Sequence, residues 1–533
     1  MKKSHPLLLS LLSGLLLYAA WPMSPLTPLI FVAWVPLLWL QERGLSGKRF
    51  FGWTYLSMLT WNATTTWWIW NASPPGAAGA IVANSLLMCL PFAAGYFVKR
   101  RMGDRAGHIA LVAFWLSFEY FHLRDWGLSW PWLTLGNVFA GHTGWVQWYA
   151  FTGVSGGGCW ILVTNILVFQ MLATKKWRVY SGWLAAVLLV PIGISIGLSA
   201  RERHLAELPA EAGTPARNIV IVQPNIDPYK KLSTGSFDAM LQKLIRISES
   251  GLDSNTTLLI WPETALYMEN HINEENMKGN YFLNPLWDFL RRHPHISLLT
   301  GVESYRMYKN GQQTTTARKV EGDLYVDDYN AAMVLDSTGP LAIYHKTMLV
   351  PGVETLPPFL HILDSWFEKF GGTSSGYTGQ TARTVLPAAG QYHIAPAVCY
   401  ESIYGEFMSR YVRNGADLIA VITNDGWWGN TPGYRQHENY ARLRCIETRR
   451  WLVRSANTGV SCVIDPLGNI VELRSWDTEA FIRRTVPVES GLTFYVAFGD
   501  LVSWLAIAIT ILITGQLLWR GLKSFAKNKS RHG

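Results

Sequence analysis

Only 16% of the 533 residues are charged, whereas 49% are hydrophobic and 26 are tryptophan. Soluble proteins usually carry about 25% charged residues, so this composition indicates a membrane protein, and the length allows about two to four domains. The net charge of +9 does not indicate a nucleic-acid partner, because the positive residues lie largely in short segments between apolar runs.

The cysteines exclude two further classes of protein. Their number is odd and no CxxC pair occurs, so the sequence predicts neither a disulfide framework nor a zinc site. We expect no metal ion, no other cofactor, and at least one free thiol. The five are Cys89, Cys159, Cys399, Cys445 and Cys462.

Eight apolar segments predict a bundle of membrane-spanning helices. Each is about as long as a helix that crosses a ~30 Å hydrocarbon core, although the second and fifth are short. The first is also compatible with a signal peptide, but further spans follow at once without a clean cleavage site, so we expect an uncleaved anchor. The segments are 6–22, 27–41, 51–70, 77–98, 107–121, 147–173, 181–199 and 494–519.

Lysine and arginine are unevenly divided between the loops that join these segments. With the N-terminus in the cytoplasm, almost all of them lie on the cytoplasmic side, and the opposite short loops carry only Arg124. Cytoplasmic loops of membrane proteins carry such an excess of positive charge. Seven spans then place residues 200–493 outside the cytoplasm, and the eighth returns the C-terminal tail to it.

The long region between the seventh and eighth segments predicts an α/β domain. Several of its strand-like stretches are continuous apolar runs, as in sheets covered on both faces, and a hairpin turn is expected at 336–340. Strands are expected in 216–226, 255–265, 296–304, 330–339, 392–402, 417–426, 450–459 and 461–473, and helices in 236–250, 283–293, 403–414 and 434–450.

Three of these strand-like stretches lead into a reactive side chain. Glu263 lies in LLIWPETAL, Lys346 in IYHKTMLVPGVE and Cys399 in PAVCYESIYGE. Active groups collect where strands end, because a rigid sheet can aim them. Taken singly, however, these residues are more often a loop carboxylate, a solvated lysine and a buried core thiol.

Together the three residues form a coherent set for acyl transfer. A thiolate attacks an acyl carbonyl, while a carboxylate takes the thiol proton and later returns it. A lysine ammonium lowers the pKa of the thiol and stabilises the oxyanion. Histidine is not needed if Glu263 is the base, and His393 is interpreted as a polar residue at the start of its strand. Cys445 and Cys462 are interpreted as core thiols on a helix and a strand.

The segments WPETA, HKTMLVPGVE and VCYES resemble, in this order, the three signature segments of the nitrilase superfamily. The stretch 423–461 is similar too, and so is the outer loop EYFHLRDWGLSWPWLTLGN. With its apolar spans, nearly the whole chain resembles one membrane-embedded branch of that superfamily, the apolipoprotein N-acyltransferases. The resemblance implies an α-β-β-α sandwich in which Glu263 is the base, Lys346 the ammonium and Cys399 the nucleophile.

The resemblance also implies a reaction in two steps on the outer face of the bacterial inner membrane. Cys399 takes an acyl chain from a phospholipid, typically phosphatidylethanolamine, and the N-terminal α-amine of a diacylated apolipoprotein then attacks the thioester. This is the last step of lipoprotein maturation. The implied domains are a seven-span bundle (1–200), a periplasmic catalytic domain (215–490), a transmembrane helix (494–519) and a basic cytoplasmic tail (520–533). We expect a monomer.

Other positions carry over from the resemblance. Glu354 matches a second essential glutamate that helps to hold Lys346 and the oxyanion site, and Tyr400 and Glu401 match residues beside the nucleophile. For Glu401 the alternative is a structural hydrogen bond that shapes the nucleophile loop. The chain departs from the family pattern at Leu232, Gly352 and Val353, so the lid loops and the acyl preference do not follow from the resemblance.

Two other functions stay open. A membrane-tethered amidase would use the same triad of Glu263, Lys346 and Cys399, with water as the acceptor. The triad therefore does not distinguish an amidase from an acyltransferase. The membrane bundle favours lipid substrates. A transporter or binding protein without chemistry is disfavoured by the intact triad and by the lack of charge in the clearer spans. Glu119 is the exception, and we expect it in the outer loop.

Overall fold

The computed structural model describes residues 5–207, 218–229, 237–355, 376–389 and 392–532. The chain forms two compact units. A helical unit comprises residues 1–67, 78–196 and 498–533, and an α/β unit comprises residues 68–77 and 197–497.

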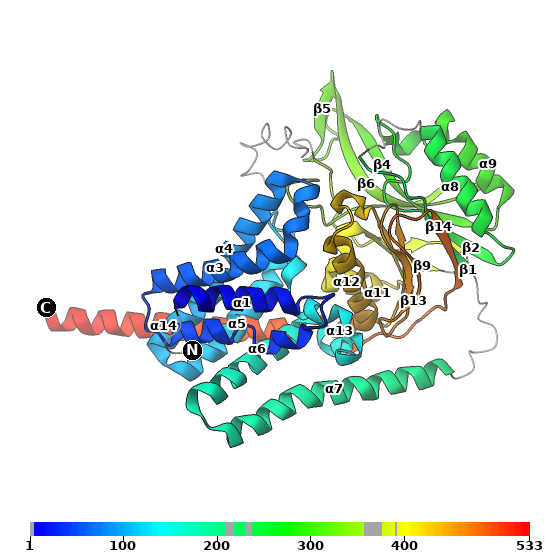
Figure 1. Ribbon diagram of the computed structural model, residues 1–533. Coiled ribbons are helices and arrows are strands. Elements are labelled where there is room, and N and C mark those ends of the chain that lie inside the picture. The colour runs from blue at the N-terminus through cyan, green and yellow to red at the C-terminus, as the bar shows by residue number, and fades with distance from the viewer. Residues whose placement is uncertain (1–4, 208–217, 230–236, 356–375, 390–391, 533) are drawn as a thin grey trace. The chain divides into compact units, whose positions relative to one another are not determined.

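Helices occupy all eight of the predicted apolar segments (Figure 1). By length and composition, four helices of the described chain could cross a membrane, namely those over 74–102, 149–174, 177–205 and 501–524. Two shorter apolar helices lie over 6–20 and 27–41. The helices are α1 (Pro6–Ala20), α2 (Val35–Gln41), α3 (Gly47–Thr66), α4 (Pro74–Met102), α5 (Asp104–His122), α6 (Tyr149–Thr174), α7 (Trp177–Glu207) and α14 (Leu501–His532).

The sequence predicts Glu119 in the outer loop, and this prediction is wrong. It lies inside helix α5, where its side chain is buried. Its Oε1 accepts a hydrogen bond of 2.7 Å from the backbone N–H of Leu135. A carboxylate that satisfies a buried backbone donor can remain in the interior of the helical unit, and hydropathy alone does not reveal such a partner.

The α/β unit contains two mixed β-sheets (Figure 1). The larger sheet has eight strands, with β14-β1-β2-β4-β6-β5 as its main order, β3 pairing with β4 and β7 pairing with β6. Its strands are β1 (Asn218–Gln223), β2 (Thr256–Ile260), β3 (Ile272–Asn273), β4 (Ser297–Lys309), β5 (Arg318–Glu321), β6 (Leu324–Asp336), β7 (Gly339–His345) and β14 (Ala480–Thr485).

The smaller sheet has six strands in the order β13-β12-β11-β10-β9-β8. Its central strands β9, β10 and β11 are parallel to one another and entirely or almost entirely buried, which explains their continuous apolar sequences. The strands are β8 (Leu386–Pro387), β9 (His393–Val398), β10 (Leu418–Thr423), β11 (Trp451–Ala456), β12 (Ser461–Ile464) and β13 (Ile470–Arg474).

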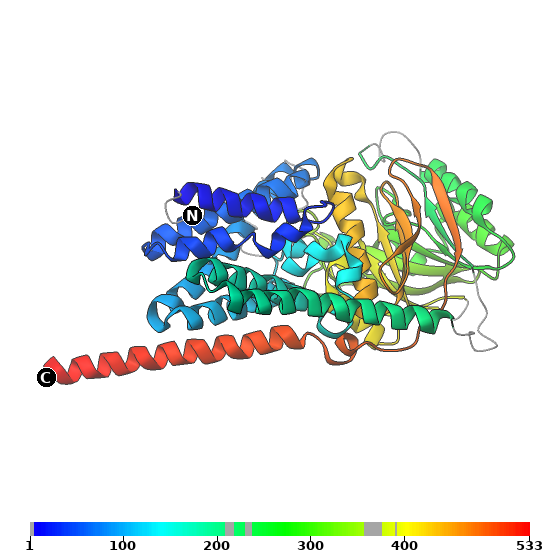
Figure 2. The ribbon, with the colours of Figure 1, turned by 60° about the horizontal axis from the view of Figure 1, so that its bottom comes forward.

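Helices cover the outer face of each sheet, so the unit is an α-β-β-α sandwich, as the resemblance implied (Figure 2). Helices α8 (Phe237–Gly251) and α9 (Asn284–Arg292) pack on the larger sheet, and α11 (Gly405–Arg413) and α12 (Pro432–Thr448) pack on the smaller one. The two sheets face each other, and the Ser455 hydroxyl on β11 donates to the Val222 carbonyl on β1 at 2.8 Å.

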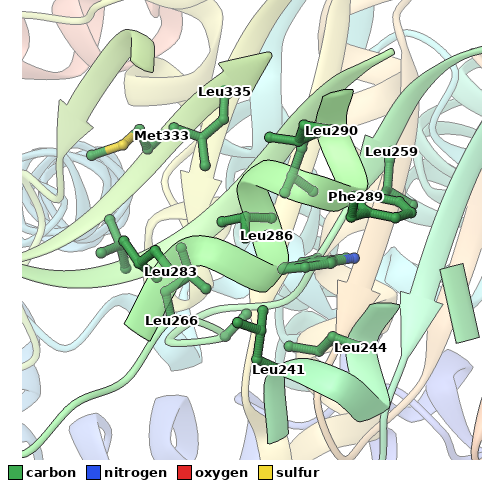
Figure 3. Packing of buried hydrophobic residues seen from close by; sticks show 14 of the residues in the cluster. Leu241, Leu244, Leu259, Leu266, Leu283, Leu286, Phe289, Leu290, Met333 and Leu335 are labelled. Atoms are coloured by element: carbon green, nitrogen blue, oxygen red, sulfur yellow. The ribbon is translucent and has the colours of Figure 1, made fainter. Parts of the chain in front are cut away.

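The core under α8 and α9 shows why these segments form helices. Leu241 and Leu244 on α8, and Leu286, Phe289 and Leu290 on α9, recur at helical spacing and point toward the sheet (Figure 3). Burying one such side chain contributes about 1.5–3 kcal/mol. This layer holds β2 and β4 in place, and β2 leads directly into Glu263.

Candidate active site

The structure brings four of the predicted site residues together. The Nζ of Lys346 lies 2.7 Å from Oε1 of Glu354 and 3.4 Å from Oε1 of Glu263. The thiol of Cys399 lies near enough to Glu263 and Lys346 for both charges to shift its pKa. All four side chains are buried, with Cys399 8% exposed and Lys346 1% exposed.

The reacting groups come from the ends of strands in both sheets. Glu263 follows β2 and Lys346 follows β7, both in the larger sheet, whereas Cys399 follows β9 in the smaller one. Since each strand is fixed by its ladder of hydrogen bonds, the three side chains are held by the two sheets and not by the loops alone.

Glu263 is positioned by an unusually close approach to strand β4. A Cβ built on Gly301 would lie 2.6 Å from Cα of Glu263 and 2.5 Å from the backbone N of Thr264. Thr264 itself has a φ of 50°, in the left-handed region that is costly for a β-branched residue. Glycine at position 301 therefore lets the WPET loop dock against the sheet.

Asn330 completes the carboxylate cluster, and the sequence analysis missed it. Its Nδ2 donates to Oε1 of Glu263 at 2.8 Å and to Oε1 of Glu354 at 3.0 Å. The second oxygen of Glu263 accepts the backbone N–H of Asn424 at 3.1 Å. Asn330 lies in the interior of β6, where only its polarity on a buried strand distinguishes it.

Glu354 holds Lys346 and the loop that follows it. Its Oε2 accepts a hydrogen bond of 2.8 Å from the backbone N–H of Val350, so the carboxylate also stabilises the turn between Val350 and Glu354. Gly352 has a φ of 80° in this turn, and the N–H of Val353 bonds to the carbonyl of Val350 at 3.2 Å. Leu232, the third departure from the family pattern, lies outside the described residues.

Cys399 has an unusual backbone conformation. It has a φ of 53°, and this left-handed conformation costs a residue with a side chain roughly 1–2 kcal/mol. The strained residue begins the short 3₁₀ helix η10 (Cys399–Ile403) directly after β9. Such strain is often found at functional sites, where the surrounding structure has to maintain it.

Glu401 ties the nucleophile loop to the lysine loop. Its carboxylate accepts hydrogen bonds from the Tyr344 hydroxyl at 2.6 Å, from the N–H groups of Thr347 and Met348 at 2.7 and 3.1 Å, and from the N–H of Val398 at 2.9 Å. Burial raises its pKa to about 7. These contacts favour the structural alternative for Glu401.

Tyr400 and the remaining candidates lie where their sequences suggested. The ring of Tyr400 is buried and packs edge-on against Tyr404, with 5.3 Å between centroids. Cys445 and Cys462 are buried on α12 and β12. His393 lies at the start of β9 and bonds to Asp417 at 3.0 Å.

The electrostatics of the site keep Lys346 charged and the resting thiol neutral. Burial alone would lower the pKa of Lys346, but Glu354 and Glu263 together raise it above its usual value. Burial and the charge of Glu263 raise the pKa of Cys399, and Lys346 offsets only part of this increase. A neutral thiol needs a base before it can attack a carbonyl, and the carboxylate whose charge acts on Cys399 most strongly is that of Glu263.

A second buried cluster meets the backbone carbonyl of Cys399 through His437, and its members were not predicted from the sequence. Asp425, His437 and Arg454 are fully buried and bonded to one another. All three lie in the stretch 423–461, but only their polarity within otherwise apolar or helical segments signals them. Among the described residues, no group of three or more His, Cys, Asp and Glu side chains is placed to hold a metal ion.

Comparison with known proteins identifies the family. Residues 218–491 match the model of the carbon-nitrogen hydrolase family, and residues 13–167 match that of the apolipoprotein N-acyltransferase N-terminal domain. The chain is 33% identical over 524 residues to the apolipoprotein N-acyltransferase of Chlorobaculum tepidum, an alignment that covers 95% of each chain. The chain belongs to the apolipoprotein N-acyltransferase family.

Further relatives show the same family relationship. The apolipoprotein N-acyltransferase of Azotobacter vinelandii is 28% identical over 531 residues, covering 96% of this chain and 95% of the relative. Among solved structures, the carbon-nitrogen hydrolase of Helicobacter pylori is 14% identical with a TM-score of 0.38, covering 54% of this chain and 94% of that one. The carbon-nitrogen hydrolase match and the Chlorobaculum tepidum relative confirm the resemblance stated from the sequence.

The raised pKa of Cys399 predicts an unusual pH dependence for its alkylation. Because the thiolate is the reactive form, the rate should still rise above pH ~9, where a free cysteine of pKa about 8.5 levels off. The test is to alkylate the folded protein with iodoacetamide from pH 6 to 10.5 (about the range of a thiol titration). The rate is measured by mass spectrometry of the peptide that contains Cys399 after digestion. A plateau at or below that of free cysteine would contradict the burial argument.

Gly301→Ala should displace Glu263. The new Cβ has no room against the WPET loop, so we expect a loss of about 1–3 kcal/mol in stability and slower reaction of Cys399. Gly491→Ala is the matched control, because a Cβ at that position meets nothing within 4 Å. Thermal unfolding and the alkylation rate measure the two effects. Equal behaviour of the two variants would show that the close approach at Gly301 does not hold Glu263.

Proposed function

We propose that this protein transfers an acyl chain from a membrane phospholipid to the N-terminal α-amine of diacylated apolipoproteins, completing lipoprotein maturation. The observation that carries the proposal is the buried Glu263–Lys346–Cys399 site in a chain that matches the N-acyltransferase family over 95% of its length. We assign Glu263 as the base, Lys346 as the oxyanion-stabilising ammonium and Cys399 as the nucleophile.

In the first step Glu263 takes the Sγ proton and the thiolate attacks the ester carbonyl of the phospholipid. The Lys346 ammonium stabilises the oxyanion of the tetrahedral intermediate; one preorganised donor of this kind contributes roughly 3–4 kcal/mol. When the intermediate collapses, the C–O ester bond breaks and Glu263 returns its proton to the leaving alkoxide. The products are a Cys399 thioester and a lysophospholipid.

In the second step the neutral α-amine of the apolipoprotein attacks the thioester carbonyl. Glu263 takes a proton from the amine, the C–S bond breaks, and the proton returns to the thiolate of Cys399. The enzyme regains its resting state and the acceptor carries a new amide bond. Glu354 contacts Lys346, and Asn330 contacts Glu263, and we assign Glu354 and Asn330 to holding that pair.

The location of the reaction is part of the same proposal. The placement of lysine and arginine supports eight spans, with both termini in the cytoplasm and residues 215–490 in the periplasm. Four helices of sufficient length and hydropathy support a membrane location. The domain limits are those expected from the sequence, the membrane is the bacterial inner membrane, and the working unit is a monomer.

A membrane-tethered amidase is the second candidate. The match to the carbon-nitrogen hydrolase family over residues 218–491 favours it, because the same three side chains would hydrolyse a small amide if water replaced the amine. The first step would then release ammonia or an amine instead of a lysophospholipid.

Formation of an acyl-enzyme separates these functions. Incubated in detergent with phosphatidylethanolamine and no acceptor, the purified protein should gain the mass of one fatty-acyl group, and hydroxylamine should remove it. Cys399→Ala should gain nothing, and adding a diacylated lipopeptide should discharge the adduct as an N-acyl product. Hydrolysis of a small amide without any lipid adduct would overturn the transferase assignment in favour of the amidase.

The topology is tested separately with epitope tags in intact spheroplasts. A tag at the exposed turn at 310–312 between β4 and β5 should be accessible to antibody from outside, and a tag after Gly533 only after the membrane is permeabilised. Tags accessible at both positions, or at neither, would contradict the proposed orientation.

A further inference from the structure

A chain of buried polar contacts ends on the backbone carbonyl of Cys399. Nη2 of Arg454 lies 2.9 and 2.8 Å from the two carboxylate oxygens of Asp425, and Nδ1 of His437 lies 3.1 Å from Oδ1 of Asp425. Nε2 of His437 lies 3.0 Å from the carbonyl oxygen of Cys399. The side chains of the three polar residues are fully buried, so water does not compete for these bonds.

The neighbours of His437 determine which ring nitrogen carries the proton. Burial lowers the pKa of His437, and the charge of Arg454 lowers it further against the opposing effect of Asp425. Nε2 lies 3.0 Å from the Cys399 carbonyl oxygen and 2.9 Å from the Ser402 hydroxyl oxygen, and that hydroxyl donates to the same carbonyl. Both oxygens can accept from Nε2, and the carbonyl can only accept, so the neutral ring carries its proton on Nε2. Nδ1 accepts from Nη2 of Arg454, 3.0 Å away.

The bond matters because of the strained backbone at Cys399. A residue with a φ of 53° stays in that conformation only when its surroundings hold it there. The Cys399 carbonyl accepts from His437 and also from the Ser402 hydroxyl at 2.9 Å. Since the peptide unit is planar, fixing this carbonyl fixes the whole Cys399–Tyr400 peptide and with it the direction of the thiol.

Aromatic rings hold the imidazole on another side. Trp428 packs edge-on against the His437 ring, with centroids 5.5 Å apart, and Trp68 packs edge-on against Trp428 at 4.9 Å. A Cβ on Gly433 would lie 2.6 Å from the Trp68 ring, so helix α12, which carries His437, begins in close contact with that ring. The segment 68–77 belongs to the α/β unit and contributes directly to this packing.

We infer that His437 is a positioning residue for the nucleophile: held by Arg454, which Asp425 fixes in turn, it fixes the Cys399 backbone and so aims the thiol at the acyl carbonyl. It touches no reacting atom and acts only through the carbonyl of Cys399. The inference rests on the proposed role of Cys399 as the nucleophile and goes beyond it by naming what maintains the reactive conformation.

The test compares three variants of the full-length protein. His437→Leu removes the donor, His437→Gln keeps an N–H near the position of Nε2, and His393→Leu is the matched control. Nδ1 of His393 lies 3.0 Å from Asp417, as Nδ1 of His437 lies 3.1 Å from Asp425, but His393 lies at the opposite end of β9 from Cys399. Each protein is assayed for Cys399 alkylation by iodoacetamide, for single-turnover acylation over a range of phosphatidylethanolamine concentrations, and for thermal unfolding.

We expect His437→Leu to slow alkylation and acylation of Cys399 about 10- to 100-fold, the effect of misplacing a reacting group by about 1 Å. The half-saturating lipid concentration should not change, His437→Gln should recover most of the rate, and His393→Leu should react like the wild type. Alkylation of His437→Leu at the wild-type rate would overturn the inference. The inference would also be overturned if His437→Leu and His437→Gln lost the same fraction of their alkylation and acylation rates, in proportion to their loss of thermal stability. The effect would then be one of folding alone.

Iodoacetamide needs no lipid, and this keeps the inference separate from the proposed function. If the wild type forms no acyl adduct while His437→Leu still slows alkylation, the lipid donor is wrong and the positioning role stands. If the wild type is acylated but alkylation is the same in all variants, the proposed function stands and the positioning role fails.

Discussion

The buried ammonium of Lys346 is the constraint on which the catalytic unit depends. An uncompensated charge in a protein interior costs several kcal/mol, and Lys346 is 1% exposed. Glu354 and Glu263 neutralise it at 2.7 and 3.4 Å. Two carboxylates around one lysine leave an excess of negative charge, and Asn330 offsets part of it by donating to both. The arrangement is stable only when all four side chains are present.

That requirement explains much of the architecture. The cluster needs residues from β2, β6 and the loop after β7, so the larger sheet must hold these strands in one register. Cys399 arrives from β9 in the other sheet, and Glu401 bonds to the backbone on both sides, at Val398 and at Thr347. The sandwich thereby brings a nucleophile from one sheet to a charge cluster on the other. A single sheet would present its strand ends along one edge and could not surround the substrate carbonyl from two sides.

The sequence predicts those features that depend on local patterns, and it does not reveal those that depend on contacts between distant segments. Glu263, Lys346 and Cys399 were predicted because each directly follows an apolar strand inside a recognisable motif. The expected helices of the α/β unit formed, and so did the expected strands, except that 461–473 is a hairpin of two strands, β12 and β13. Strand β14 was missed because its sequence, AFIRRT, carries charges on an edge strand that is only partly buried. Asn330 and His437 were missed because their roles depend on partners far away in the chain. Glu119 was misplaced for a different reason, because its partner is a backbone N–H, which no residue type in the sequence reveals.

The same chemistry leaves one question that the triad does not decide, namely whether an amine or water discharges the thioester. Glu263 can take a proton from either, and Lys346 stabilises either oxyanion. The choice therefore depends on how well water is excluded while the acyl chain waits on Cys399. Cys399 is only 8% exposed, so few water molecules can reach the sulfur, and the same burial raises the pKa of the thiol. A buried nucleophile that is slow to ionise is thus suited to a transferase, because the conditions that make the resting cysteine unreactive also protect the intermediate until an acceptor amine arrives.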